Sequence, residues 1–208
     1  MLRITIANRM PPSPPAMSIT STPTHEEVIA ATRHWLEKAV IGLNLCPFAK
    51  AVHAKRQIRY LVSDAEVVED LLPLLFEELQ TLATAEPAAI ETTLLIHPKV
   101  LTDFADYNDF LDIADSAIDE LGLTGEIQIA SFHPDYQFAG TQPQDIDNYT
   151  NRAPYPTLHL LREESVAQAV EAFPDAADIF EKNIATLRAI DPEKLGDYGF
   201  PVGGRSAT

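Results

Sequence analysis

One thiol and two His-Pro pairs are the residues of this chain whose types and positions could do chemistry. Cys46, the only cysteine among 208 residues, is followed by Pro47 and then by several basic side chains. His97 and His133 are each followed by proline as well. A thiolate is a nucleophile and a metal ligand, and a neutral imidazole is a base and a metal ligand. These positions therefore indicate either nucleophilic catalysis or a metal site.

Cys46 is expected at the start of a helix. Gly42 suits the left-handed end of a preceding helix, and Pro47 suits the first position of the next one. Cys46 would then be the N-cap, where unpaired amide groups and the helix dipole lower the pKa of a thiol below its usual value of about 8.5. The competing interpretation is a small buried side chain that fills a corner between helices. Dithiol redox chemistry is excluded, because there is no second cysteine.

The two His-Pro pairs are expected at the ends of strands. The runs ETTLLIHP and IQIASFHP read as buried strands, and a proline keeps the residue before it out of the helical region. If the two strands are parallel, His97 and His133 emerge at the same edge of the sheet, where open α/β proteins bind ligands. Each could serve as a general acid or base. The alternative for each is a hydrogen-bonded structural role.

The polar stretch 134–156 predicts a binding loop. Loops longer than about 12–15 residues are uncommon and are usually binding loops or disordered, and the aromatic residues here favour packing over disorder. Arg152 is suited to a carboxylate or phosphate through its planar guanidinium, with a salt bridge to one of the many acids as the alternative. The candidate substrate-binding residues, which include a mid-strand histidine, are Tyr136, Gln137, Asn148, Asn151, Arg152 and His159.

Helix signals surround these positions. Thr24 and Glu27 form a capping box for a helix over 25–42, and Ser63 with Glu66 predicts the start of a second helix. Asp103 can cap a third that stops at Gly122. Two short helices are expected at 165–173 and 175–190.

The strands complete the fold prediction. They are expected at 58–63, 91–98, 127–134 and 157–163, and they alternate with the helices except across the 134–156 loop. This order predicts an α/β domain with a largely parallel sheet of about four strands covered by helices.

The domain is expected over residues 25–195. Residues 1–24 are rich in proline and contain no acid, which predicts a disordered tail, and Met17 is an alternative start of the chain. The glycine-rich end, 196–208, is expected to be loose.

The composition limits the partners. A net charge of −16 would repel nucleic acid and anionic lipid, and no apolar run approaches the ~20 residues of a transmembrane helix. A single free thiol favours the reducing cytoplasm. We therefore expect a cytoplasmic protein that binds a small anionic substrate, and neither nucleic acid nor a membrane. The oligomeric state and any cofactor stay open.

Several segments together resemble a bacterial family known only as a domain of unknown function, fourteen-fifteen in that series. They are Leu-Cys-Pro-Phe-Ala at 45–49, Phe-His-Pro-x-Tyr-Gln-Phe at 132–138, and Thr-Asn-Arg-x-Pro-Tyr-Pro-Thr-Leu-His at 150–159. The resemblance covers about residues 25 to 190. It implies no activity, so the chemistry must come from the residues themselves.

The residues leave three functions open. The first is an enzyme, a hydrolase or a transferase of acyl or amidino groups, with Cys46 as nucleophile, His133 or His97 as general acid/base, and Arg152 orienting the substrate. The second is a site for Zn²⁺ or Fe²⁺ held by Cys46, His97 and His133 with an acid such as Asp135. The third is a non-enzymatic binding module whose 134–156 loop contacts a partner.

Overall fold

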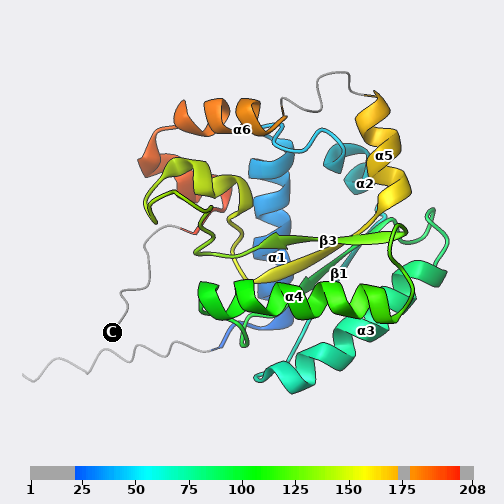
Figure 1. Cartoon of the computed structure of the whole chain (residues 1–208). Coiled ribbons are helices and arrows are strands. Elements are labelled where there is room, and N and C mark those ends of the chain that lie inside the picture. The colour runs from blue at the N-terminus through cyan, green and yellow to red at the C-terminus, as the bar shows by residue number, and fades with distance from the viewer. Residues whose placement is uncertain (1–21, 173–178, 202–208) are drawn as a thin grey trace, which may run out of the picture.

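A four-stranded sheet with helices on both faces forms the body of the protein (Figure 1). The computed structural model describes residues 22–172 and 179–201. The strands are β1 (Ile58–Val62), β2 (Thr92–Ile96), β3 (Ile127–Phe132) and β4 (Thr157–Arg162). The α/β class, the four strands and the helical cover predicted from the sequence are confirmed, but the strand pairing is mixed, with one parallel and two antiparallel pairs, where a largely parallel sheet was expected. The disorder predicted for residues 1–21 and 202–208 lies outside the described residues.

Three of the strands point in one direction and one is reversed. The order across the sheet is β1-β2-β4-β3. β1 and β2 are parallel, whereas β4 is antiparallel to both of its neighbours, β2 and β3. A parallel return requires a crossover of a dozen or more residues, usually a helix, whereas an antiparallel return does not. The loop between β3 and β4 contains only the short 3₁₀-helix η2 (Ile146–Asn151), and the chain reverses there.

The helices divide between the two faces of the sheet. The first face is covered by α3 (Val68–Thr84) and α4 (Phe104–Glu120). On the opposite, second face lie α1 (His25–Trp35), which continues as the π-helix η1 (Leu36–Ile41), and α6 (Ile179–Arg188). Figure 1 shows α2 (Ala49–Ala54) and α5 (Glu163–Ala172) on this second side as well.

The first face carries the larger apolar core. Leu71, Leu75 and Leu79 recur along α3 at the spacing of one helical face, and all are fully buried. They pack in one cluster with Leu95 of β2 and Leu158 of β4. Each such side chain contributes roughly 1.5–3 kcal/mol on burial. This face therefore carries the main apolar packing between the sheet and its two helices.

The first helix does not end at Gly42 in the left-handed conformation that the sequence suggested. Gly42 has φ −64°, and the left-handed residue is Asn44, with φ 56°. The glycine is required for a different reason: a Cβ there would lie 2.3 Å from the carbonyl oxygen of Lys38. The capping box of Thr24 and Glu27 at the start of α1 is confirmed.

Two further boundary predictions differ from the structure. Ser63 does not cap α3, which begins after Val67 with no side-chain cap; the Ser63 hydroxyl instead accepts the N–H of Ala65. The chain end expected to be loose is packed as far as residue 201. The 3₁₀-helix η4 (Pro192–Tyr198) is followed by Phe200, which is 3% exposed and contacts the core of the second face.

Candidate functional site

The two His-Pro histidines lie at the same edge of the sheet, as the sequence predicted. His97 follows β2 and His133 follows β3, and both side chains point to the first face. The ring of Tyr107 from α4 lies between them, with centroid distances of 5.8 Å to His97 and 5.1 Å to His133. Both histidines are fully buried. The structure therefore brings them together, but inside the protein.

Hydrogen bonds give both imidazoles a structural role. His97 Nδ1–H donates to the Val100 carbonyl (3.0 Å), and His133 Nε2–H donates to the Leu101 carbonyl (3.2 Å). His133 Nδ1 accepts the N–H of Asp135 (3.0 Å). Both rings thus brace the loop after β2, in which Leu101 has φ 55°, a conformation that costs a non-glycine residue roughly 1–2 kcal/mol. Burial lowers the pKa of His97 to about 4 and also lowers the pKa of His133.

The predicted binding loop uses its polar side chains to hold itself together. The buried Asn148 accepts the N–H of Phe138 and the hydroxyl of Thr141, and it donates to the Gln142 carbonyl. Arg152 is 8% exposed. Its guanidinium lies 4.5 Å from the centroid of the Tyr149 ring.

The remaining candidates in the loop make similar internal contacts. Arg152 donates to the carbonyls of Tyr136 (3.2 Å) and Pro143 (2.5 Å). Gln137 donates to the Thr141 carbonyl, and Asn151 to the Ser131 carbonyl. The Tyr136 ring packs 5.1 Å from that of Phe104. These contacts explain the loop's order without a ligand.

Cys46 is not the N-cap of a helix, which corrects the sequence prediction. The N-cap of α2 is Phe48, and the helix begins at Ala49. Cys46 lies two residues earlier, in the turn that follows η1, and its side chain is half-buried with a free thiol. The geometric argument for a thiolate stabilised by the helix amides is therefore lost. The cysteine remains a partly exposed free thiol.

A π-helix fixes the turn that carries Cys46. The Val40 carbonyl, in the last turn of η1, accepts the N–H groups of both Leu45 (2.9 Å) and Cys46 (3.3 Å). The side-chain amide of Asn183 from α6 holds the Leu45 carbonyl (2.8 Å). π-Helical turns are rare and are frequently found at functional sites. No sequence signal that we used predicted this one.

The thiol belongs to the second face, whereas His97 and His133 belong to the first. Leu45 and Ala49, on either side of Cys46, pack in one cluster with Tyr60 of β1 and Phe132 of β3. These strand residues point away from α3 and α4. The sheet therefore separates Cys46 from both His-Pro imidazoles, and the catalytic grouping proposed from sequence is not assembled.

A row of side chains crosses the second face of the sheet. The strand register pairs Tyr60 with Leu94, Leu94 with His159, and His159 with Ala130. Because side chains alternate between faces, all four point to the second face. Tyr60, His159 and Ala130 are partly exposed, as is the next residue on β3 with the same orientation, Gln128. This part of the sheet is less completely covered than the first face.

His159 has a defined tautomer. The Thr92 hydroxyl donates to the Leu160 carbonyl (2.6 Å) and must therefore accept from His159, whose Nε2–H lies 2.7 Å away. Nδ1 then carries a lone pair, and it is not among the buried atoms without a partner. Burial lowers the pKa of His159 to about 4, which keeps the ring neutral at physiological pH. A neutral imidazole with one accessible lone pair can accept a proton.

Two buried donors on the same face have no partner among the described residues. They are the Tyr60 hydroxyl and Trp35 Nε1–H. Trp35 is 3% exposed and packs edge-on against Phe132 at 5.3 Å, and Phe132 in turn lies 6.1 Å from His159. An unpaired buried donor costs about 1–3 kcal/mol, so native structures contain few of them without a reason.

The described residues form neither a metal-binding cluster nor a helix that could span a membrane. Within 22–172 and 179–201, no three His, Cys, Asp or Glu side chains are grouped closely enough to hold a metal ion. The set of Cys46, His97 and His133 fails because the sheet lies between the thiol and the rings. No described helix is both long enough and apolar enough to cross a bilayer.

Comparison with known proteins identifies the family. The model of the family described as "Protein of unknown function (DUF1415)" matches residues 27–197. The chain belongs to this family. No curated protein and no solved structure matches it. The family expected from the resemblance is therefore confirmed. The family description assigns no activity.

The sequence had named two residues of this site, Cys46 and His159, and missed others. Thr92, Tyr60 and Gln128 were read only as strand residues. Their alternation with apolar neighbours would have placed them on one face of each strand. The alternation within each strand does not reveal the strand order, and the strand order decides whether these residues lie on the same face as Cys46.

Proposed function

We propose that this protein is a thiol-dependent enzyme, a hydrolase or group transferase, with Cys46 as nucleophile and His159 as base on the second face of the sheet. The observation that carries the proposal is the tautomer of His159. Thr92 occupies its Nε2–H, and the Nδ1 lone pair is left available on the face that bears the free thiol. Neither His97 nor His133 offers a comparable accessible lone pair, since both are fully buried.

The chemistry suited to these two groups is acyl transfer. The Cys46 thiol gives its proton to a water molecule, and the thiolate adds to a carbonyl carbon and expels the leaving group. The leaving group takes the proton from that water, and a thioester forms on sulfur. A second water then gives a proton to His159 Nδ1 as its oxygen attacks the thioester. The acid product leaves, and the proton passes from His159 to the departing thiolate. Another nucleophile in place of the second water gives group transfer.

A small anionic substrate suits the electrostatics. Burial alone makes His159 a weak base, because it disfavours the imidazolium form. A negative charge beside the ring favours that form and raises its pKa toward neutrality. The cation placed near this row is Arg33, whose guanidinium lies 5.2 Å from the centroid of the Tyr60 ring. Arg33 replaces Arg152, whose guanidinium is occupied by loop carbonyls, as the residue for a substrate carboxylate.

The test uses p-nitrophenyl acetate as an acyl donor. We expect wild-type protein to release nitrophenol continuously and Cys46→Ala to lose at least a hundredfold in rate. His159→Gln retains a hydrogen-bond donor for Thr92 but has no base, so it should accumulate an acetyl group on Cys46 that mass spectrometry detects. The control is His53→Gln, which removes a histidine of α2 that pairs with Glu37. Turnover by Cys46→Ala at the wild-type rate would show that the proposal is wrong.

The charge of the substrate is tested separately. An ester with a carboxylate on its acyl chain, such as mono-p-nitrophenyl glutarate, should react about tenfold faster in kcat/KM than the acetate. Arg33→Gln should remove that preference and leave the acetate rate unchanged. If wild type shows no preference, the thiol mechanism stands and only the anionic substrate class is rejected.

A further inference from the structure

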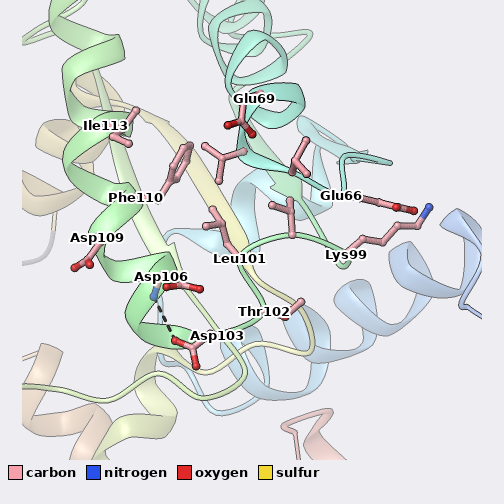
Figure 2. A pocket seen from close by; sticks show the side chains of 13 residues that line it. Glu66, Glu69, Lys99, Leu101, Thr102, Asp103, Asp106, Asp109, Phe110 and Ile113 are labelled. Atoms are coloured by element: carbon pink, nitrogen blue, oxygen red, sulfur yellow. Dashed lines mark hydrogen bonds between the residues drawn. The ribbon is translucent and has the colours of Figure 1, made fainter.

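A groove on the first face is independent of the proposed thiol site. It lies between the first turns of α3 and α4 and the loop that follows β2, and its volume is about 610 Å³ (Figure 2). Figure 2 shows Leu101 and Phe110 between the two helices, with Glu69 on the α3 side and Asp106 on the α4 side. The groove is open to solvent and combines an apolar floor with a charged rim.

The rim is strongly acidic. Glu66 and Glu69 come from the α3 side, and the other three carboxylates are those of Asp103, Asp106 and Asp109. The single basic residue that lines the groove is Lys99.

Lys99 does little to offset these acids. Its Nζ lies 2.9 Å from a carboxylate oxygen of Asp64, which does not line the groove. Since the ammonium charge is already paired, the groove keeps an unbalanced negative potential. A ligand that fits it must bring positive charge.

The floor and walls are apolar enough to hold side chains as well. Val67 is 48% exposed and Ile113 is 44% exposed, and both line the groove. Contiguous exposed apolar area rimmed by polar residues marks interaction sites, and these two side chains add such area to the groove. The occupant should therefore be a basic segment with an apolar side, rather than a simple cation.

One segment of this chain has that character. Residues 1–10, MLRITIANRM, include two arginines, and no acid occurs before residue 26. Leu2, Ile4 and Ile6 alternate with Arg3 and other residues, and alternate side chains of an extended segment point to opposite sides. Such a segment can place its apolar side chains on the floor and its guanidinium groups at the rim.

The point where the chain enters the described fold lies beside the groove. His25, the first residue of α1, has its Nε2 3.1 Å from Asp64 Oδ1, the same oxygen that Lys99 contacts. The chain from Thr22 back to Met10 can span up to about 40 Å. That length is far more than the distance between the side chains of His25 and Lys99, which contact the same Asp64 oxygen. Tethering also raises the effective concentration to about the millimolar range, so a weak contact suffices.

We infer that residues 2–10 of this chain occupy the acidic groove of their own molecule. The apolar contacts supply the short-range attraction, and the arginine–carboxylate pairs select this segment. Because those pairs lie at the solvent-exposed rim, their contribution falls as salt rises. The occupied groove would cover the loop after β2 that His97 and His133 brace.

A photo-crosslinking experiment on the full chain tests this inference. Ile6 is replaced by p-benzoyl-phenylalanine, the protein is irradiated at low salt, and the cross-linked peptides are mapped. We expect intramolecular links to residues 66–69 and 99–113. The double substitution Asp106→Asn and Asp109→Asn should lower the yield at least fivefold.

The matched control changes the same charge on the same helix. Asp112 and Asp115 lie further along α4, are exposed, and do not line the groove. Their double change to Asn should leave the yield within about twofold of wild type. Arg3→Glu with Arg9→Glu should abolish the link to the groove.

Three outcomes would overturn the inference. They are cross-links spread over other surfaces, covalent dimers that show the groove is filled by a second copy, and equal loss of yield in the groove variant and the control. A native protein whose mass begins at Met17 would overturn it as well, because the basic segment would be missing. None of these results bears on the thiol chemistry of the second face.

Discussion

The histidines on the two faces of the sheet differ in their exposure to solvent. On the first face, His97 and His133 are fully buried and use their ring nitrogens to hold backbone carbonyls of the loop after β2. On the second face, His159 is partly exposed and, like His97, has one nitrogen held, in this case by Thr92. The comparison teaches that a histidine's chemistry depends on whether the nitrogen left unpaired can reach a ligand, and that burial lowers the pKa in both settings.

Two tyrosine hydroxyls also differ. The Tyr107 hydroxyl, on the first face, donates to the Thr157 carbonyl (2.8 Å) and accepts the N–H of Phe132 (3.1 Å). The Tyr60 hydroxyl, on the second face, is buried without a hydrogen-bond partner among the described residues. The contrast concerns these two hydroxyls alone, because the first face also has buried atoms without a partner, among them Thr93 Oγ1 and His97 Nε2.

The largest expected effect is that of Tyr107→Phe. Removing this hydroxyl leaves a buried carbonyl and a buried N–H unpaired, at about 1–3 kcal/mol each. We expect the free energy of unfolding to fall by about 4 kcal/mol, measured by urea denaturation. A loss below about 1 kcal/mol would mean that water replaces the hydroxyl and that the first face is not closed.

The second prediction concerns pH. Because burial lowers the pKa of His97 from 6.5 to about 4, the unfolded chain binds a proton in this range that the folded chain does not. Stability should therefore be complete above about pH 6.5 and fall by about 3 kcal/mol as the pH drops to about 4. His97→Gln should remove this part of the pH dependence.

His159 gives the comparison within that experiment. Because burial lowers the pKa of both rings to about 4, His159→Gln should flatten the curve about as much as His97→Gln does. Urea midpoints measured from pH 7.5 to pH 4 check this. A clearly smaller effect of His159→Gln would mean that solvent reaches this ring and that the second face is the more open one.

Thr92→Val is expected to have an intermediate effect. Valine keeps the β-branched shape but leaves His159 Nε2–H without its acceptor, at about 2 kcal/mol of stability. Nitrogen NMR shifts of the His159 ring should report a mixture of tautomers in place of one. Thr92→Ser, which keeps the hydroxyl, should preserve the single tautomer. Unchanged shifts in the valine variant would remove the argument for the Nδ1 lone pair.

The smallest expected effect on stability is that of Tyr60→Phe. Its hydroxyl makes no hydrogen bond of good geometry, although the nearby Arg33 guanidinium interacts with it, so the free energy of unfolding should change by less than about 0.5 kcal/mol. If the hydroxyl contacts the substrate, KM for the acyl donor should rise instead. Tyr107→Phe and Tyr60→Phe each remove one hydroxyl, so comparing their free energies of unfolding tests the difference between the two faces.

The sequence predicted the helices and strands better than it predicted where some helices end and which residues contact one another. The capping box at Thr24 and the cap at Asp103 depend on side chains within three residues of the helix start, and both are confirmed. Gly42 and the N-cap assigned to Cys46 were wrong because the first helix continues as a π-helix, which the 3.6-residue period does not indicate. Arg152 was read as a ligand for an anion because its carbonyl partners come from a loop without periodicity.

The sequence by itself determined that this is an acidic α/β protein, that its two His-Pro pairs end strands, and that it belongs to the family whose model matches residues 27–197. Those properties follow from composition and from interactions between near neighbours. Only the tertiary structure decided that Cys46 shares a face with His159 and is divided from His97 and His133 by the sheet. The reason is physical: the order and direction of strands are set by packing between residues distant in the chain, and reversing one strand changes which side chains become neighbours.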